Sequence, residues 1–373
     1  MPAPPTSGRP VLCAYVSGHG FGHFTRSAAV LERLRHHATI HLRTSGSALA
    51  LARRAPWLSS ITDVDVGPGV CQRGPLEPDL AATRAALAEH LRRLPDLVEA
   101  EARWLAGVGA SAVLADVPPL GLAAAHRAGV PAVGLGNFTW SWIYDGYAHH
   151  HPDFARAAAA LRPLEAQADL FLALEGGGGL EHLPRVVPVA PVYRRPRLDR
   201  AAARRRLGLE AVDATVVLAS FGGFGGALDL AHAAAHNPGL FLLVVGGPSG
   251  LAPGRALSVE PDADLTHPDL MAACDCVLGK PGYGTAAEAL HRPTPFVHVP
   301  RGEFREQAAL CAFIARYLPQ AALSSADFTA GNWSAAVAEA LAARPPAPPP
   351  PGDGVAEAAA RLGAVLGVRP DAQ

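Results

Sequence analysis

The fold is decided at residues 11–24, VLCAYVSGHGFGHF, where an apolar run leads directly into a glycine-rich loop. The run Val11–Val16 is typical of a buried strand. The glycines of the loop allow a sharp turn and the close approach of a ligand to the backbone. A helix is expected over His23–Arg35. This stretch therefore predicts the first strand, loop and helix of a βαβ unit.

The same alternation of short apolar runs and helical patterns continues outward from this stretch. Asp79–Leu105 carries leucines at a helical period and is predicted to be a helix, with Pro95 as a kink or break. Further strands are expected at Thr39–Arg43, Ile61–Val66, Ala112–Leu114, Ala132–Leu135, Leu170–Leu174 and Val186–Val189.

A segment rich in proline and arginine, Val192–Arg200, separates this half from a second α/β half. Strands of the second half are expected at Thr215–Ala219, Phe241–Val245, Cys276–Leu278 and Phe296–Val299. Two such halves predict an α/β protein with two Rossmann-like domains facing a cleft, and ligands at the carboxyl ends of the strands. We expect an N-terminal domain at 1–190, a linker at 191–200, a C-terminal domain at 201–343, and a Pro-rich spacer with a helix at 344–373.

Composition narrows the class of protein. The chain has 373 residues, 49% of them apolar, with 32 basic and 33 acidic side chains, which gives length for two domains and no electrostatic reason to expect nucleic acid as a partner. No apolar run is long enough to cross a bilayer, so no stable membrane insertion is expected. The five cysteines are scattered and indicate neither zinc nor a disulfide framework. A reduced, cytoplasmic protein is predicted.

His23 is the first candidate for catalysis. At a helix start the helix dipole disfavours imidazolium, and a neutral imidazole is a competent general base near pH 7. Asp116 follows a strand at the same edge of the sheet and is placed to accept a hydrogen bond from His23. His19 competes for the same role from the loop. The alternatives are local packing for His23 and an N-cap of the next helix for Asp116.

Aromatic side chains gather at residues 137–144, NFTWSWIY, in a chain that is only 6% aromatic. Because aromatic faces bind the CH surfaces of sugars, this segment is expected to wall an acceptor pocket, with core packing as the common alternative. The candidate acceptor contacts are Asn137, Phe138, Trp140 and Tyr144.

Two glycine-rich segments in the second half are suited to phosphate. SFGGFGG, residues 220–226, follows a strand and resembles an anion-binding nest. In GKPGYGTAAE, residues 279–288, a helix is expected to begin near Thr285, where its free N–H groups would receive a diphosphate. Lys280, the only lysine of the chain, would add a point charge. Thr285 and Glu288 also fit a capping box, and Glu288 alternatively fits the hydroxyls of a ribose.

A dinucleotide-binding site is the weaker interpretation of the first loop. Gly18, Gly20 and His23 fill the places of G-x-G-x-x-G, with histidine in place of the third glycine. No acidic residue ends the second strand; Arg43 stands there and would suit a 2′-phosphate. An NADP-dependent oxidoreductase therefore stays open as an alternative.

The chain resembles the GT-B glycosyltransferases that use nucleotide-diphosphate sugars. It is similar to the bacterial GlcNAc transferase that makes lipid II and to plant natural-product glucosyltransferases. It is most similar to the glycosyltransferase-like N-terminal region of plant L-arabinokinases. Three stretches carry this resemblance, which spans roughly residues 11–343: SGHGFGHFTR at 17–26, NFTWSWIY at 137–144, and the segment from Gly279 through RGEFREQ at 301–307.

The resemblance implies roles for the matching residues. His23 would deprotonate the acceptor hydroxyl and Asp116 would pair with it. Glu288 would hold the donor ribose, and Glu306 and Gln307 would lie near hydroxyls of the donor sugar. Lys280 and Tyr283 stand where the plant signature has histidine and tryptophan. The residues expected to bind the donor are Gly20, Gly22, Ser220, Gly222, Gly223, Lys280, Gly282, Tyr283, Gly284, Thr285, Glu288, Arg301, Glu306 and Gln307.

The sequence thus predicts an inverting glycosyltransferase that moves a sugar from a nucleotide-diphosphate donor, a UDP-sugar, to a hydroxyl acceptor in one displacement. The acceptor is expected to be a small molecule or a lipid-linked compound, and neither a metal nor a cofactor is expected. A nucleotide-sugar epimerase and a non-catalytic nucleotide-sugar-binding protein remain alternatives beside the oxidoreductase.

Overall fold

The computed structural model describes residues 8–74, 76–222, 229–246 and 255–371 of the chain. It divides into two compact units. Unit 1 holds the chain up to Cys71, Leu80–Val192 and the chain from Gly352, and unit 2 holds Gln72–Asp79 and Tyr193–Pro351. The segment 72–79, embedded in the first half of the sequence, thus packs with unit 2, and the C-terminal segment packs with unit 1.

Unit 1 is built on a seven-stranded sheet in the order β3-β2-β1-β4-β5-β6-β7, with every neighbouring pair parallel. The direction of strand succession reverses between β1 and β4, which is the switch point where such sheets bind ligands. The strands are β1 (Val11–Val16), β2 (Thr39–Thr44), β3 (Ser60–Asp63), β4 (Ala110–Asp116), β5 (Ala132–Phe138), β6 (Leu170–Gly178) and β7 (Val186–Pro188).

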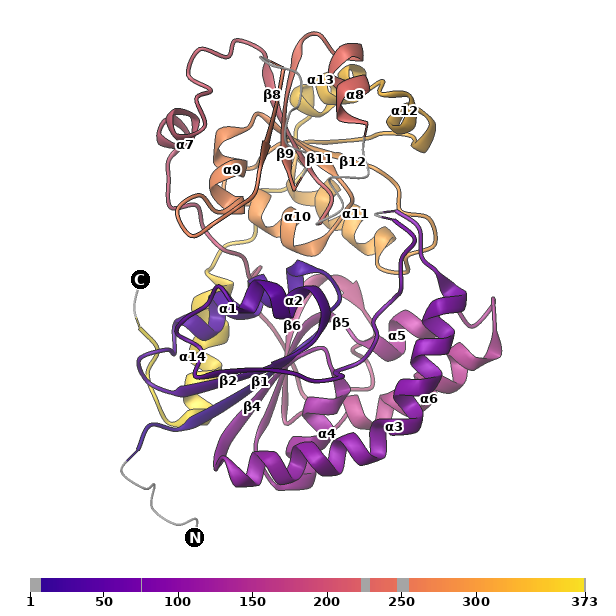
Figure 1. The fold of residues 1–373 in the computed structure, drawn as a ribbon, viewed down its shortest axis with the longest axis vertical. Helices are drawn as coiled ribbons and strands as arrows, with labels where there is room; N and C mark the ends of the chain where they lie inside the picture. Colours follow the sequence, from indigo (N-terminus) through magenta and orange to yellow (C-terminus); the bar gives the residue numbers. More distant parts are fainter. Residues whose placement is uncertain (1–7, 75, 223–228, 247–254, 372–373) are drawn as a thin grey trace. The chain divides into compact units, whose positions relative to one another are not determined.

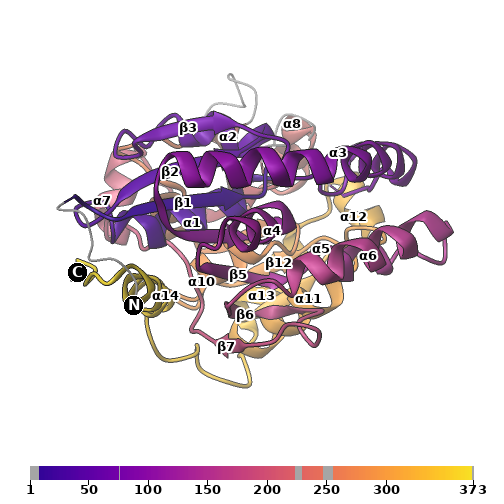
Figure 2. The ribbon, with the colours of Figure 1, turned by 90° about the horizontal axis from the view of Figure 1, so that it is seen from below.

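Helices cover both faces of this sheet. The helices are α1 (Phe21–Glu32), α2 (Gly46–Ala52), α3 (Leu80–Gly107), α4 (Pro119–Ala128), α5 (Trp140–Asp145), α6 (Pro152–Glu165) and α14 (Gly354–Leu366). Helices α1 and α14 pack together on one face (Figure 1), while α3 lies beside α4 on the other (Figure 2). The carboxyl ends of β1 and β4 are therefore held between two helical layers.

Helix α3 continues through Pro95 for 28 residues, so the expected kink does not end it. Proline removes one backbone donor from a helix interior, a cost that tertiary packing can offset. The offset here includes a buried ion pair: Glu101 of α3 accepts hydrogen bonds from Tyr15 of β1 and Arg43 of β2.

Unit 2 has a six-stranded parallel sheet in the order β10-β9-β8-β11-β12-β13. Its strands are β8 (Thr215–Ser220), β9 (Leu240–Val245), β10 (Ala256–Val259), β11 (Cys276–Gly279), β12 (Phe296–His298) and β13 (Gln320–Ala322). The sequence analysis missed β10 and β13, because three or four residues at a sheet edge carry little hydrophobic periodicity.

The two faces of this second sheet bury separate apolar clusters. Val217 and Ala219 of β8 face one cluster with Trp333, while Val216 and Leu218 face the other, which contains residues of α9 to α11. The helices of unit 2 are α7 (Arg200–Arg206), α8 (Leu230–His236), α9 (His267–Ala273), α10 (Tyr283–Ala289), α11 (Gln307–Tyr317), α12 (Ser325–Ala330) and α13 (Ser334–Ala342).

The C-terminal helix α14 is anchored to unit 1 at both ends. Near its start the Glu357 carboxylate accepts a hydrogen bond from the Ala190 N–H. After its end the Asp371 N–H donates to the Arg33 carbonyl, and the Asp371 carboxylate lies 2.8 Å from Nε2 of His37. The Pro-rich spacer before α14 thus connects the second unit back to the first.

Both units confirm the predicted class of two Rossmann-like α/β folds. Within the described residues, no helix combines the length and the apolarity that a bilayer crossing requires.

Candidate active site

His23 and Asp116 meet at the switch point of the unit 1 sheet. Helix α1 begins at Phe21, after Gly20 turns the chain with a φ of 74°, so that His23 lies in the first helical turn. Asp116 is the last residue of β4. The His23 Nδ1 lies 2.8 Å from Asp116 Oδ1, and both side chains are buried. The predicted contact is therefore present.

Asp116 does not cap the next helix, which was its alternative role. The N-cap of α4 is Pro118, and Val117 between them has a φ of 66°. A β-branched residue in the left-handed region is strained, and such strain costs about 1–3 kcal/mol. The chain thus bears a local cost directly beside the carboxylate that holds His23.

Two further residues of α1 bind the same carboxylate, and the sequence analysis named neither as a site residue. The Arg26 Nε donates to Asp116 Oδ2 at 2.7 Å and its Nη2 donates to Oδ1. Ser27 Oγ donates to Oδ2 at 2.7 Å. Arg26 Nη2 also lies 3.1 Å from His23 Nδ1. The i, i+3 spacing of His23 and Arg26 on one helix was the available signal.

The surroundings of Asp116 keep it ionised. Burial alone would raise the pKa of this carboxyl, but the charge and hydrogen bonds of Arg26, together with His23, lower its pKa to about 2. Asp116 is therefore an anion throughout the physiological range and cannot take the Nδ1 proton.

This arrangement selects one tautomer of His23. Asp116 Oδ1 only accepts, so the contact requires a proton on Nδ1 and leaves a lone pair on Nε2 of the neutral ring. Among the residues that the structure describes, Nε2 has no hydrogen-bond partner. An Nε2 so disposed can accept a proton from a hydroxyl group.

Aromatic rings surround His23. Phe138 lies edge-on to the imidazole with ring centroids 5.8 Å apart, and Trp140 lies 6.4 Å from it. Tyr144 stacks on Trp140 and donates from its hydroxyl to the Gly69 carbonyl. These three rings, which with Asn137 are the four predicted acceptor contacts, are buried and pack around His23.

His19 and Asn137 make packing and hydrogen-bond contacts around the His23–Asp116 pair. The His19 ring packs edge-on against Trp140 at 5.6 Å, and the described side-chain contacts of the Asp116 carboxylate come from residues of α1. The Asn137 amide oxygen accepts from Arg26 Nη1 at 3.0 Å, and its nitrogen donates to the Gly176 carbonyl. Asn137 thus connects Arg26 to the backbone of β6.

Unit 2 contains a second buried carboxylate, Glu288 of α10. Its Oε2 lies 2.6 Å from His267 Nδ1, and its Oε1 accepts from Arg194 Nε at 3.1 Å and Nη2 at 2.9 Å. The other ring nitrogen of His267 lies 2.9 Å from Ser220 Oγ, at the carboxyl end of β8. Burial would raise the pKa of Glu288, but Arg194 and His267 lower it.

Helix α10 begins at Tyr283, two residues before the expected start, with Gly282 as N-cap. The capping box between Thr285 and Glu288 is therefore absent, because Thr285 lies inside the helix rather than at its N-cap. Gly284 and Thr285 fall in the first turn. The Tyr283 ring is buried and packs near Phe313 of α11, with ring centroids 6.4 Å apart.

Lys280 lies against the turn after β8. Gly222 there has a φ of 63°, and a Cβ at this position would come within 3.2 Å of Lys280 Nζ. Burial, assisted by the nearby Arg301 charge, lowers the pKa of Lys280 to about 8, while Glu306 opposes the shift. Gly223, also predicted to bind donor, lies outside the described residues.

The predicted sugar-binding pair is tied to Arg301. Arg301 Nη1 donates to Glu306 Oε1 at 2.9 Å, and the Arg301 N–H donates to the Gln307 side-chain oxygen. The guanidinium lies 3.7 Å from the centroid of the Phe304 ring. Its Nε is buried without a hydrogen-bond partner in the described part of the chain. The segment therefore presents one carboxylate and two nearby cations, Arg301 and Lys280.

Arg43 is not placed to hold a 2′-phosphate. It is buried, donates to Glu101 of α3, and lies 3.9 Å from the centroid of the Trp104 ring. These contacts occupy the residue on which the NADP alternative depended.

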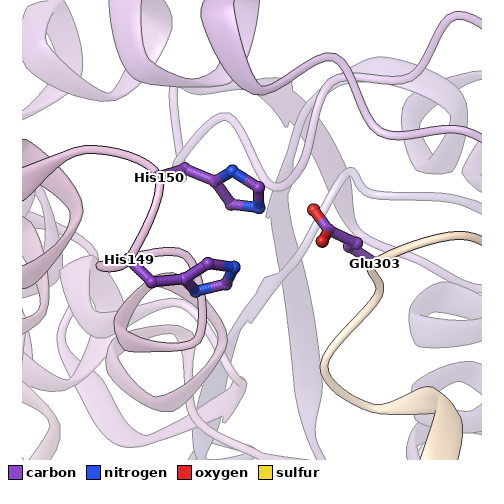
Figure 3. Close-up of side chains that lie close together, drawn as sticks. All are labelled: His149, His150 and Glu303. Carbon is purple, nitrogen blue, oxygen red and sulfur yellow. The ribbon is translucent and has the colours of Figure 1, made fainter.

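Other acidic and histidine groups have structural partners or too few ligands. Asp-x-Asp triplets occur at 63–65 and 262–264; Asp65 binds His90 and Arg93, and Asp262 accepts from backbone N–H groups of its own turn. The His149 and His150 rings lie next to each other, tilted by 41° with centroids 4.0 Å apart (Figure 3). Glu303, drawn with them, belongs to unit 2. Two adjacent histidines alone are fewer than the three protein ligands of a catalytic metal site.

No protein-family model matches the sequence. The chain is similar to L-arabinokinase of Arabidopsis thaliana, with 31% identity over an alignment of 347 positions that covers 90% of this chain. The match covers 32% of that protein, so this chain spans about a third of its relative's length. The predicted resemblance to L-arabinokinase is thereby confirmed.

Solved structures confirm the GT-B fold. A UDP-glucosyltransferase of Polygonum tinctorium matches 98% of this chain and 100% of its own, with a TM-score of 0.60 and 14% identity. UGT89C1 of Arabidopsis thaliana, complexed with quercetin, matches 96% of this chain and 100% of its own, with a TM-score of 0.63 and 13% identity. The two parallel sheets with their helices are thus the two-domain fold of GT-B glycosyltransferases.

Proposed function

We propose that this protein is a glycosyltransferase that moves a sugar from a UDP-sugar to a hydroxyl group of a small molecule. The observation that carries the proposal is the contact between His23 Nδ1 and Asp116, whose carboxyl pKa is about 2, because this contact leaves Nε2 of the imidazole as the proton acceptor. The GT-B fold supports it, because neighbours with this fold are glycosyltransferases.

The reaction is a single displacement. His23 Nε2 accepts the hydroxyl proton as the acceptor oxygen attacks the anomeric carbon, and the bond from that carbon to the diphosphate breaks with its electrons on the leaving group. Attack from the face opposite the leaving group inverts the anomeric configuration. General-base catalysis of this kind contributes about 10²–10⁴-fold to a rate. Asp116 stabilises the imidazolium that forms.

Unit 2 is the donor-binding part of this proposal. Glu288 offers buried carboxylate oxygens for ribose hydroxyls, and His267 and Arg194 keep it ionised. Lys280 and Arg301 supply positive charge for a diphosphate, with Gly282, Gly284 and Thr285 at the start of α10. Positive groups aimed at a developing charge are often the largest single catalytic contribution. No metal is part of this mechanism.

Ligands of the structural neighbours support the donor and acceptor classes of this proposal. UGT89C1 has been crystallised with UDP-L-rhamnose and with quercetin, and an anthocyanidin 3-O-glucosyltransferase with UDP. We therefore take a UDP-sugar as donor and a phenolic or similar hydroxyl compound as acceptor; a lipid-linked acceptor is the second choice. All five cysteines are free thiols, which suits a cytoplasmic location.

The first experiment is a thermal-shift screen with UDP-, dTDP-, GDP- and ADP-sugars and with NADPH. A ligand that binds only the folded state raises the free energy of unfolding, by about 2.7 kcal/mol when its concentration is 100 times its Kd. The melting temperature rises as a result. We expect stabilisation by a UDP-sugar and none by NADPH. The stabilising donor is then incubated with quercetin and other polyphenols, and the products are analysed by mass spectrometry.

Each alternative has its own signature in this experiment. A new glycoside together with free UDP supports the proposal. Conversion of the nucleotide sugar without an acceptor indicates an epimerase, and donor binding without turnover over a broad acceptor panel indicates a non-catalytic binding protein. Stabilisation by NADPH alone would overturn the proposal.

A further inference from the structure

Arg26 is a buried charged residue, and burying a charge is costly unless it is paired. Its side chain is 3% exposed, and its three nitrogens reach both oxygens of Asp116 and the amide oxygen of Asn137. A histidine–aspartate pair requires only one acceptor on the carboxylate. Here Arg26 and Ser27 add three more donors, so that four hydrogen bonds saturate the two carboxylate oxygens.

We infer that Arg26 is a positioning residue that acts on His23 through Asp116: its charge balances the carboxylate and thereby keeps the imidazole neutral and ready to accept a proton. The inference rests on the proposed role of His23 as a base. Without Arg26, Asp116 would be a buried anion whose nearest cation would be the protonated His23 itself. The base would then be held in its protonated, inactive form.

The positions of Arg26 and Asp116 determine in which direction the Arg26 charge acts on the protonation of His23. Arg26 Nη2 and His23 Nδ1 converge on the same oxygen, Asp116 Oδ1, and lie 3.1 Å apart. An opposite charge within 4–6 Å favours the charged form of a group, and a like charge disfavours it, each by about 1–3 pH units. Asp116 and Arg26 thus lie at nearly equal distances from the His23 Nδ1 and carry opposite charges.

Few other ionisable groups face His23. His19, from the loop before α1, and Tyr144, from α5, both pack against Trp140. Burial raises the pKa of Tyr144 above its ordinary value, so its phenol stays neutral. Ser27, Asn137 and Phe138 complete the shell and carry no charge. Among the described residues in this shell, Asp116 and Arg26 therefore supply the fixed charges.

The test is a nuclear magnetic resonance titration of His23 that needs no substrate. The protein is labelled at histidine Cε1, and His23 is assigned from its missing signal in His23→Gln. The titration midpoint of His23 is measured between pH 4 and 9 in the wild type, Arg26→Gln, Arg26→Lys and Ser27→Ala. Ser27→Ala is the matched control, since it removes a neutral donor from the same carboxylate.

We expect the midpoint to rise by at least about one pH unit in Arg26→Gln. Arg26→Lys keeps the positive charge but loses the planar guanidinium with its several donors, and its His23 midpoint should stay near that of the wild type. The midpoint in Ser27→Ala should also stay near the wild-type value. A folded Arg26→Gln protein with an unchanged midpoint, or one shifted no more than Ser27→Ala, would overturn the inference.

A further variant covers the case in which Arg26→Gln does not fold. Asp116→Asn combined with Arg26→Gln removes both charges together, so that neither charge is left buried without its partner, and its midpoint should stay near that of the wild type. A midpoint at least about one pH unit below the wild type would contradict the inference, because it would mean that Arg26 does not balance Asp116. Because the readout is the titration itself, it separates this inference from the proposed transferase activity, which is measured by product formation.

Discussion

The two units build similar residues into clusters with different connections. In unit 1, Asp116 is bound by Arg26, His23 and Ser27; in unit 2, Glu288 is bound by Arg194 and His267, and Ser220 binds the far side of His267. Both clusters consist of a carboxylate, an arginine, a histidine and a serine.

The difference lies in what each histidine has left to offer. Ser27 contacts the carboxylate, so His23 keeps Nε2 available, whereas Ser220 occupies the second nitrogen of His267. Burial differs as well: the Arg26 side chain is 3% exposed, and that of Arg194 is 32% exposed. This difference agrees with the proposed division of roles, in which the unit 1 cluster transfers a proton and the unit 2 cluster holds the donor.

The largest expected effect is on folding. Asp116→Asn leaves the buried Arg26 charge without its counter-ion, and breaking a buried pair in this way costs about 3–5 kcal/mol. Glu288→Gln should cost less, because the partly exposed Arg194 can turn to water. Urea denaturation of the two variants measures the difference. Equal losses would mean that the two clusters are equivalent in stability.

The loss of folding stability at low pH tests the role of the Asp116 cluster further. The pKa of Asp116 in the folded state is about 2, below its ordinary value of 3.8, so its contribution is complete above about pH 4 and is lost as pH falls towards 2. The shift corresponds to about 2 kcal/mol. Unfolding free energies at pH 5 and pH 2.5 should show this loss in the wild type. A loss of the same size in Asp116→Asn would assign it to other carboxylates.

Fold and site could be predicted from the sequence to different depths. Most strands of both sheets follow from local apolar runs, although the short edge strands β10 and β13 do not. Glycine loops and strand ends placed His23 and Asp116 at one edge of the sheet, and the structure brings the two side chains into contact. The partners of Glu288 do not follow from local signals: Arg194 lies in the connecting segment and His267 opens a different helix, so only the folded chain brings them together. Arg26 lay within the recognised motif, but periodicity alone did not show that its side chain turns inward to Asp116.

The aromatic segment at 137–144 is an example in which burial could not be predicted from the sequence. Its density suggested a sugar platform, but Trp140 and Tyr144 stack on each other beneath His23. Whether an aromatic ring lines a pocket or packs a core depends on which neighbours cover it, and these come from distant β-strands and loops.

The smallest expected effect is on donor binding at alkaline pH. With a pKa of about 8, Lys280 loses most of its charge between pH 7 and 9. Affinity for a nucleotide-diphosphate sugar should therefore fall by about 3–10-fold over this range. Lys280→Arg is the control, because arginine stays charged and its binding should not change with pH. A wild-type affinity that is flat from pH 7 to 9 would remove Lys280 from the donor contacts.

The most direct test of the contrast between the clusters compares His23→Gln with His267→Gln on the donor that stabilises the wild type. Calorimetry gives the donor Kd of each variant, and product formation gives kcat. We expect His23→Gln to lose about 10²–10⁴-fold in kcat with an unchanged Kd. We expect His267→Gln to weaken donor binding about tenfold, because Glu288 loses the hydrogen bond that holds its carboxylate in place, with kcat nearly unchanged. Full turnover by His23→Gln would contradict the proposed role of His23 as the base.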